Sequence, residues 1–212
     1  MNNSKLFRAG SIAAIVAWCA GIGTVLVTRG IVVQGSELVE PRSKIAALIS
    51  NHAEIVLRFM ALDTLFVIGY VTVFAVLFLS VAPENRLIAG IGIGAGLVGA
   101  LADTFENLFY ITYATAALNG NSVEPVLPFH YFASMLKWLG AFSALGFFAL
   151  VFPTRTTFER ILVILMCTFP LGGALSIASP QFFLMRALFF VVGFPLFAVY
   201  FWQLAKNSES AK

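Results

Sequence analysis

The sequence predicts an all-α fold: a single transmembrane domain, residues 1–212, built as a bundle of six membrane-spanning helices. Composition carries the first part of this prediction, because 60% of the residues are hydrophobic and only 11% are charged, whereas soluble domains carry about 25% charged residues. A soluble chain of this length cannot bury that much apolar surface. The composition therefore excludes a nucleic-acid-binding protein and a secreted disulfide scaffold, and it makes membrane lipids the expected surroundings of the chain.

The second observation is a set of six apolar runs. Each is long enough to cross a hydrocarbon core, which takes about 20 helical residues. The runs lack the period-2 alternation of membrane β-strands, so helices are expected. They lie at about 11–29, 54–82, 87–117, 129–152, 161–178 and 181–205.

The distribution of basic residues predicts the orientation of the bundle. Seven basic residues fall on one side of the predicted membrane and three on the other, at Arg29, Arg42 and Lys44. Cytoplasmic loops carry an excess of Lys and Arg, so both termini are expected in the cytoplasm. The seven on that side are Lys5, Arg8, Arg86, Arg155, Arg160, Lys206 and Lys212.

Two local patterns bear on how the spans begin and pack. Glycines occupy alternate positions over residues 90–96, which would let neighbouring helices approach the third span closely. A short helix at the membrane interface is expected from Lys44 to Ile49. Asn51, with Glu54 three residues later, then predicts a side-chain cap at the start of the second span.

Six ionisable residues fall inside the predicted spans, three acidic and three basic. A charge at membrane depth costs several kcal/mol unless it is paired or hydrated. Counted from the expected outer ends, all six lie in the middle or outer half of the bundle, where they would surround a pocket opening outward between spans two, three, four and six. They are Arg58, Asp63, Asp103, Glu106, Lys137 and Arg186.

Helical spacing groups these charges with other polar residues. Asp103, Glu106, Asn107 and Tyr110 recur at intervals of three and four residues on the third span, and His130, Ser134 and Lys137 do so on the fourth. The short connection between these spans predicts that the two stripes face each other. The candidate ligand-binding or proton-handling residues are Asp63, Asp103, Glu106, Asn107, Tyr110, His130, Lys137 and Arg186.

Structural explanations compete with this hypothesis. The basic side chains of Arg58, Lys137 and Arg186 lie close enough to the interface to reach the lipid headgroups. Arg58 can also pair with Glu54, one helical turn earlier. The carboxylates could belong to an ion-pair network that only holds helices together. His130 could be a capping or interfacial residue at the start of a helix.

Common catalytic, nucleotide-binding and metal-binding motifs do not indicate a reaction for this protein. The sequence contains no His-Glu-x-x-His, Gly-x-Ser-x-Gly or Walker pattern. Three scattered candidates, Asp103, Glu106 and His130, are too weak a pattern to predict a metal site, so none is expected, and no particular cofactor is indicated.

The stretch Ile45–His52, followed by Arg58 and Asp63 and by the turn at residues 83–86, resembles an uncharacterised family of bacterial six-helix membrane proteins of unknown function. The resemblance covers about the first 120 residues and rests on the order of the spans and a loose pattern. It implies a multi-pass protein of the bacterial inner (plasma) membrane. It implies no substrate.

Three hypotheses about function follow. The first is a membrane protein that binds or transports a small or amphiphilic ligand in the charged pocket. The second is a membrane enzyme that uses the buried carboxylates as acid/base groups on a lipid-like substrate. The third is an accessory subunit whose charged helices dock onto a larger complex. The sequence leaves open whether the protein is an enzyme and whether it forms an oligomer.

Overall fold

The computed structural model describes residues 3–31, 42–124, 127–178 and 189–210. Six of its helical segments are long and apolar enough to cross a membrane. The elements are α1 (Asn3–Thr28), α2 (Arg42–Asn51), α3 (Ala53–Val81), α4 (Arg86–Leu118), α5 (Leu127–Val151), α6 (Thr157–Ala178), the π-helical turn η3 (Phe189–Gly193) and α8 (Phe194–Ser210). The prediction of an all-α bundle of six spans is confirmed.

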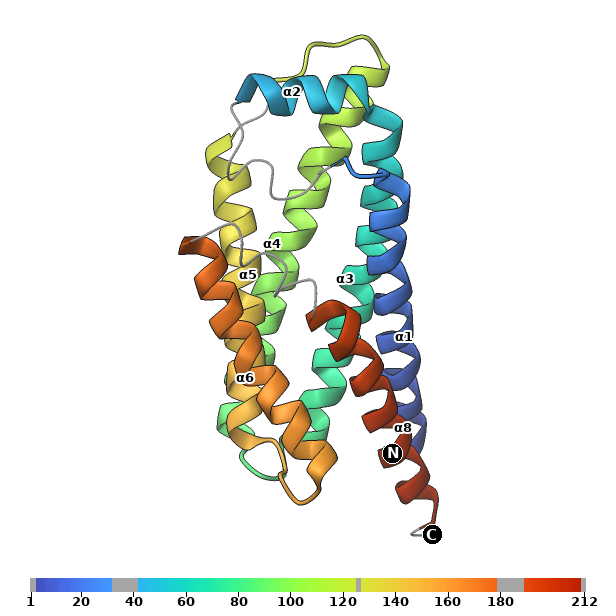
Figure 1. The fold of residues 1–212 in the computed structure, drawn as a ribbon, viewed down its shortest axis with the longest axis vertical. Coiled ribbons are helices and arrows are strands. Elements are labelled where there is room, and N and C mark those ends of the chain that lie inside the picture. The colour runs from blue at the N-terminus through green and yellow to red at the C-terminus, as the bar shows by residue number, and fades with distance from the viewer. Residues whose placement is uncertain (1–2, 32–41, 125–126, 179–188, 211–212) are drawn as a thin grey trace.

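Each span contacts the next in the order α8, α1, α3, α4, α5 and α6. The turn η3 contacts α1, α6 and α8. The short helix α2 lies across one end of the bundle, and both termini lie at the opposite end (Figure 1). The α3–α4 and α5–α6 connections also lie at the terminal end. An aromatic core fills the bundle, with Phe148, Phe197 and Phe201 among its fully buried side chains.

The helix boundaries differ from the predicted spans at two places. The expected cap at the start of the second span is wrong, because Asn51 is the last residue of α2 and His52 precedes α3 without a side-chain cap bond. The sixth span was expected from residue 181, but residues 179–188 lie outside the described part of the chain. The described part of that span begins with η3 at Phe189.

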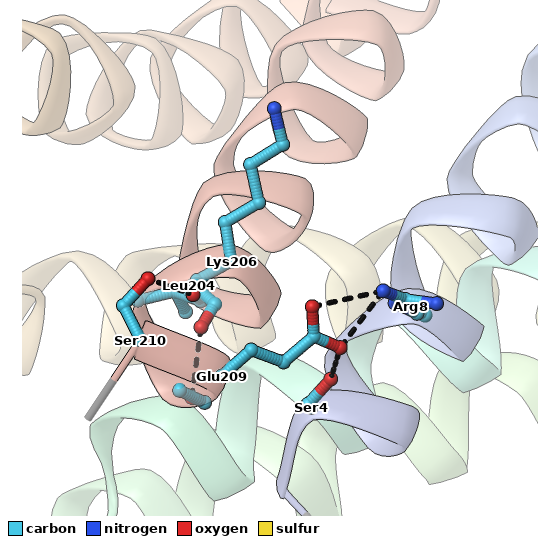
Figure 2. Close-up of polar contacts among 7 residues, drawn as sticks. Ser4, Arg8, Leu204, Lys206, Glu209 and Ser210 are labelled. Atoms are coloured by element: carbon cyan, nitrogen blue, oxygen red, sulfur yellow. Dashed lines mark hydrogen bonds and ion pairs between the residues drawn. The ribbon is translucent and has the colours of Figure 1, made fainter. Parts of the chain in front are cut away.

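Polar contacts link helices at the end of the bundle that holds both termini. Figure 2 shows Glu209 of α8 between Ser4 and Arg8 of α1: the Ser4 hydroxyl donates a hydrogen bond to the carboxylate, and the Arg8 guanidinium lies 2.8 Å from it. At the same end, Arg155 lies 2.8 Å from Glu84 and joins the two interhelical connections. These exposed pairs tie the ends of helices together but contribute little stability each.

Only some of the predicted glycine contacts form. A Cβ added to Gly92 would lie 3.0 Å from the Phe148 ring, and one added to Gly96 would lie 2.6 Å from the Phe74 ring, so these two glycines accommodate aromatic side chains. A Cβ on Gly90 or Gly94 would meet nothing within 4 Å among the described residues, so the expectation of close packing is wrong there.

A close approach of two helix backbones lies further along α4. A Cβ on Gly140 of α5 would lie 2.6 Å from Cα of Gly99 on α4. Because the obstacle is backbone rather than a flexible side chain, the helices would have to move apart to admit a methyl group. This crossing therefore requires glycine.

Gly140→Ala is expected to destabilise the protein by about 1–3 kcal/mol, the usual cost of overpacking a tight contact. The measurement is thermal unfolding in detergent, where the variant should melt several degrees below the wild type. Gly94→Ala is the matched control, since its methyl group enters open space. Equal melting temperatures for the two variants would contradict the role assigned to the Gly99–Gly140 crossing.

Candidate functional site: a buried ion-pair network beside an intramembrane cavity

The α4–α5 crossing places a lysine opposite two carboxylates. Asp103 lies four residues after Gly99, and Lys137 lies three residues before Gly140. Because α4 and α5 run antiparallel (Figure 1), both residues lie about one turn from the crossing and on the same side of it. The small glycines thus bring the two polar stripes within reach of each other.

Lys137 forms ion pairs with both carboxylates of the α4 stripe. Its Nζ atom lies 3.0 Å from Oδ1 of Asp103 and 2.6 Å from Oε2 of Glu106. The side chains of Lys137, Asp103 and Glu106 are 10%, 4% and 0% exposed. A lysine enclosed in this way does not reach toward the headgroups, so the alternative in which Lys137 extends to the interface is wrong. Pairing offsets the cost of burying its charge.

Hydrogen bonds extend the network to α3. The Tyr70 hydroxyl donates to Oδ2 of Asp103 over 3.1 Å, so Asp103 is held by α3 and by α5. The side-chain amide of Asn107 donates to Oδ2 of Asp63 over 2.8 Å. Asp63 and Tyr70 lie seven residues apart on one face of α3, which explains why both reach α4.

His130 lies at the α2 end of the same stripe on α5. It is fully buried, and its ring centroid lies 5.2, 5.2 and 5.5 Å from those of Phe109, Tyr110 and Tyr113. Ile45 and Ile49 of α2 belong to the apolar cluster that contains Tyr110. The imidazole is therefore enclosed by aromatic rings rather than exposed at a helix start.

A cavity of about 610 Å³ lies beside the network. Its polar lining includes Asp63, Tyr70, Asp103, Ser134 and Lys137. Much of the remaining wall is aromatic, from α3, α5, α6, η3 and α8, and includes Phe66, Trp138, Phe169, Phe189, Phe190 and Phe194. The lining includes Gly30 and Ile31, which follow the end of α1, and Ile31 packs against the apolar cluster that contains Ile45 and Ile49 of α2. We refer to this space as the intramembrane cavity.

The structure divides the predicted site residues into two groups. Asp63, Asp103 and Lys137 line the intramembrane cavity. Four others are buried in the network behind it and are not among the lining residues: Glu106, Asn107, Tyr110 and His130. Arg186 lies outside the described residues. Arg58 is exposed and lies 3.4 Å from Glu54, as the pairing alternative predicted.

Sequence reasoning missed the contributions of the first span and of the fifth, which supplies Phe169 of α6. The predicted pocket had walls from spans two, three, four and six, but Ala17, Gly21, Thr24 and Thr28 of α1 also line the intramembrane cavity. A signal was present, since small residues repeat at intervals of three and four along the buried face of α1. The aromatic wall left no comparable signal, because phenylalanine occurs throughout the spans.

The donor set does not indicate a metal centre. Within the described residues, no group of three or more His, Cys, Asp and Glu side chains is arranged to hold a metal ion. Cys19 and Cys167 are free and exposed on the bundle surface. The chemistry that these groups can supply is charge, hydrogen bonding and proton exchange.

These features define an α-helical, multi-pass integral membrane protein with a buried ion-pair network beside an intramembrane cavity. No protein-family model matches the chain, and neither the curated proteins nor the solved structures contain a significant match.

Lys137→Met is expected to destabilise the protein by about 3–5 kcal/mol, because it leaves Asp103 and Glu106 buried without their shared cation. Neutralising the carboxylates in the same chain, as Lys137→Met with Asp103→Asn and Glu106→Gln, should recover much of that loss. Thermal unfolding in detergent compares the variants, with Arg58→Met as the control for an exposed cation. A triple variant that melts below Lys137→Met would contradict the assigned ion pairs.

Proposed function

We propose that this membrane protein binds or transports a small or amphiphilic molecule in the intramembrane cavity. The observation that carries the proposal is a cavity of about 610 Å³ whose lining combines charged groups with many aromatic side chains. Ligand sites typically have volumes of about 300–1,000 Å³, mostly apolar walls and a few polar groups that orient the ligand. A molecule with an apolar body and one polar end suits such a space.

The proposed location is the bacterial inner membrane, with both termini in the cytoplasm. The excess of basic residues supports this orientation, since Arg86 and Arg155 lie in or beside the connections at the terminal end of the bundle (Figure 1). In that orientation, the end of the cavity near Gly30 and Ile31 is directed away from the cytoplasm. A ligand would then enter from the outer leaflet or from the outer aqueous side.

An enzyme acting on a lipid-like substrate is the second candidate. The observation that favours it is the Tyr70–Asp103 hydrogen bond on the cavity wall, because a hydroxyl and a carboxylate in contact can exchange a proton with a bound molecule. Glu106 and His130, the other acid/base candidates, do not line the cavity, so the catalytic set would be smaller than the one predicted from the sequence. The accessory-subunit hypothesis gains no support, because the buried charges point inward.

Photolabelling tests whether the cavity takes a ligand. Alkyl diazirine probes with ammonium, alcohol and carboxylate heads are incubated with the detergent-purified protein, irradiated, and mapped by mass spectrometry. At least one probe should label cavity residues. Gly21→Leu should abolish that label by filling the cavity from α1, since a Cβ there has ordinary contacts of 3.7 Å with Phe66.

Gly90→Leu is the control for this experiment, because Gly90 is outside the cavity lining and a Cβ there meets nothing within 4 Å. It should leave labelling unchanged. Labelling spread equally over lipid-facing residues, and unaffected by Gly21→Leu, would refute the proposed binding function.

Asp103→Asn and Glu106→Gln are expected to impair ligand binding more than folding. Each substitution keeps the shape of the side chain and some hydrogen bonding but removes the charge, and thereby alters the charge balance around Lys137 on the cavity wall. Melting temperature and labelling by the most effective diazirine probe are measured on the same samples. A variant that melts several degrees lower yet labels normally per folded molecule would show that the network serves only stability.

A further inference from the structure

An exposed tryptophan lies beside two cations at the end of the bundle that holds both termini. The ring centroid of Trp202 on α8 lies 5.8 Å from Cζ of Arg8 on α1 and 5.9 Å from Nζ of Lys206, one turn further along α8. An indole ring attracts cations at this distance through its negative face. None of the three residues lines the intramembrane cavity. They form a separate group, which we call the interfacial basic site.

The interfacial basic site lies where both helices change between polar and apolar sequence. On α1, the polar residues 3–5 and Arg8 precede a long apolar run. On α8, the apolar run ends near Trp202 and is followed by the polar residues 206–210. Tryptophan is enriched at the boundary between lipid headgroups and hydrocarbon. The site therefore falls at the headgroup level of one leaflet.

Apolar surface continues from this site along the contact between α1 and α8. The Ser11 hydroxyl donates a hydrogen bond to the carbonyl oxygen of Ala198 over 2.9 Å and joins the two helices. The next residue along each helix, Ile12 on α1 and Val199 on α8, is exposed. Both lie about one helical turn closer to the middle of the bundle than the interfacial basic site. An acyl chain that starts at the site can therefore lie against them.

The carboxylate that pairs with Arg8 does not occupy the whole site. Glu209 contacts Arg8 through Nη2, at 2.8 and 2.9 Å. A guanidinium has five N–H donors, so Nε and Nη1 remain as donors for a second acceptor. Figure 2 shows the ammonium group of Lys206 pointing away from the Glu209 carboxylate, and this ammonium forms no ion pair with the described residues. Both basic side chains therefore have donors for an anion at the membrane surface.

A phosphodiester suits these donors. Its anionic oxygens accept charge-assisted hydrogen bonds from guanidinium and ammonium groups. Arg8 and Lys206 are both exposed and lie beside one ring, so both can contact a single headgroup. A zwitterionic phospholipid carries its own cation, which competes for the phosphate, whereas a lipid with net negative charge does not. Basic residues beside a membrane span attract anionic headgroups for the same reason.

We propose that the interfacial basic site binds an anionic phospholipid. The phosphate contacts Arg8 and Lys206, the glycerol region lies against Trp202, and an acyl chain lies along the exposed Ile12 and Val199. In the orientation proposed above, this lipid belongs to the cytoplasmic leaflet. The inference concerns a second site and does not depend on what the intramembrane cavity binds.

The test compares two phospholipids with identical acyl chains, the anionic dioleoylphosphatidylglycerol and the zwitterionic dioleoylphosphatidylcholine. Native mass spectrometry of the detergent-purified full chain gives the dissociation constant of each lipid. Phosphatidylglycerol should bind more tightly than phosphatidylcholine. Lys206→Gln should weaken phosphatidylglycerol about fivefold, the usual effect of one basic residue on an anionic headgroup, and leave phosphatidylcholine unchanged. Combining it with Arg8→Gln should remove most of the preference.

Arg86→Gln is the matched control, because it removes an exposed cation from the start of α4, at the same end of the bundle. It should leave the affinity for phosphatidylglycerol unchanged. Melting temperatures of all variants identify any loss of binding that is due to unfolding. A folded Lys206→Gln variant that binds phosphatidylglycerol as tightly as the wild type would overturn the proposal. An equal loss in Arg86→Gln would also overturn it, because the attraction would then be general rather than local.

Competition separates a lipid site from a site for any anion. Inorganic phosphate and glycerophosphoglycerol, the headgroup without acyl chains, should not displace the bound lipid at equal concentration, because neither contacts Ile12 and Val199. Displacement by inorganic phosphate, or equal affinities of the wild type for the two phospholipids, would contradict an anionic phospholipid as the ligand. Labelling of the intramembrane cavity should be the same in all of these variants, since the two sites share no residue.

Discussion

The contact of Lys137 with Asp103 and Glu106 is the interaction on which the rest of the site depends. In a low-dielectric interior, each of these charges would be prohibitive alone, so their burial requires that α4 and α5 hold them within about 3 Å. Asp103 also accepts the Tyr70 hydroxyl, which couples α3 to the same pair. Three spans are thereby fixed relative to one another by one lysine and its partners.

Backbone geometry makes that contact available. The Gly99–Gly140 crossing brings α4 and α5 closer than any residue with a side chain would permit. Ion pairing and close packing therefore depend on each other: the glycines set the separation at which Lys137 reaches both carboxylates, and the ion pairs favour the register in which the glycines meet. Away from this crossing and from the intramembrane cavity, aromatic and aliphatic side chains pack between the helices, as Phe74 does against Gly96.

The buried network and the intramembrane cavity share part of their residues, so the charged groups differ in whether they line the cavity. Glu106 and His130 are buried and are not among the residues that line the cavity. Asp63, Asp103 and Lys137 line the space itself. The cavity lining thus combines charged and aromatic side chains, and the two kinds meet where Phe66 contacts Tyr70 and where Lys137 lies near Trp138.

The sequence by itself determined the six spans and the inward direction of the polar stripes on α4 and α5, because hydropathy sets span length and the cost of lipid-exposed charge turns Asp103, Glu106 and Lys137 inward. The contacts that these buried side chains make were decided only by the tertiary structure. Helical spacing alone could not choose whether Lys137 or Arg58 would be buried. The pairing of Asp63 with Asn107, the α1 wall of the cavity and its aromatic lining depend on helix rotation and crossing. Those are set by packing between residues far apart in the chain.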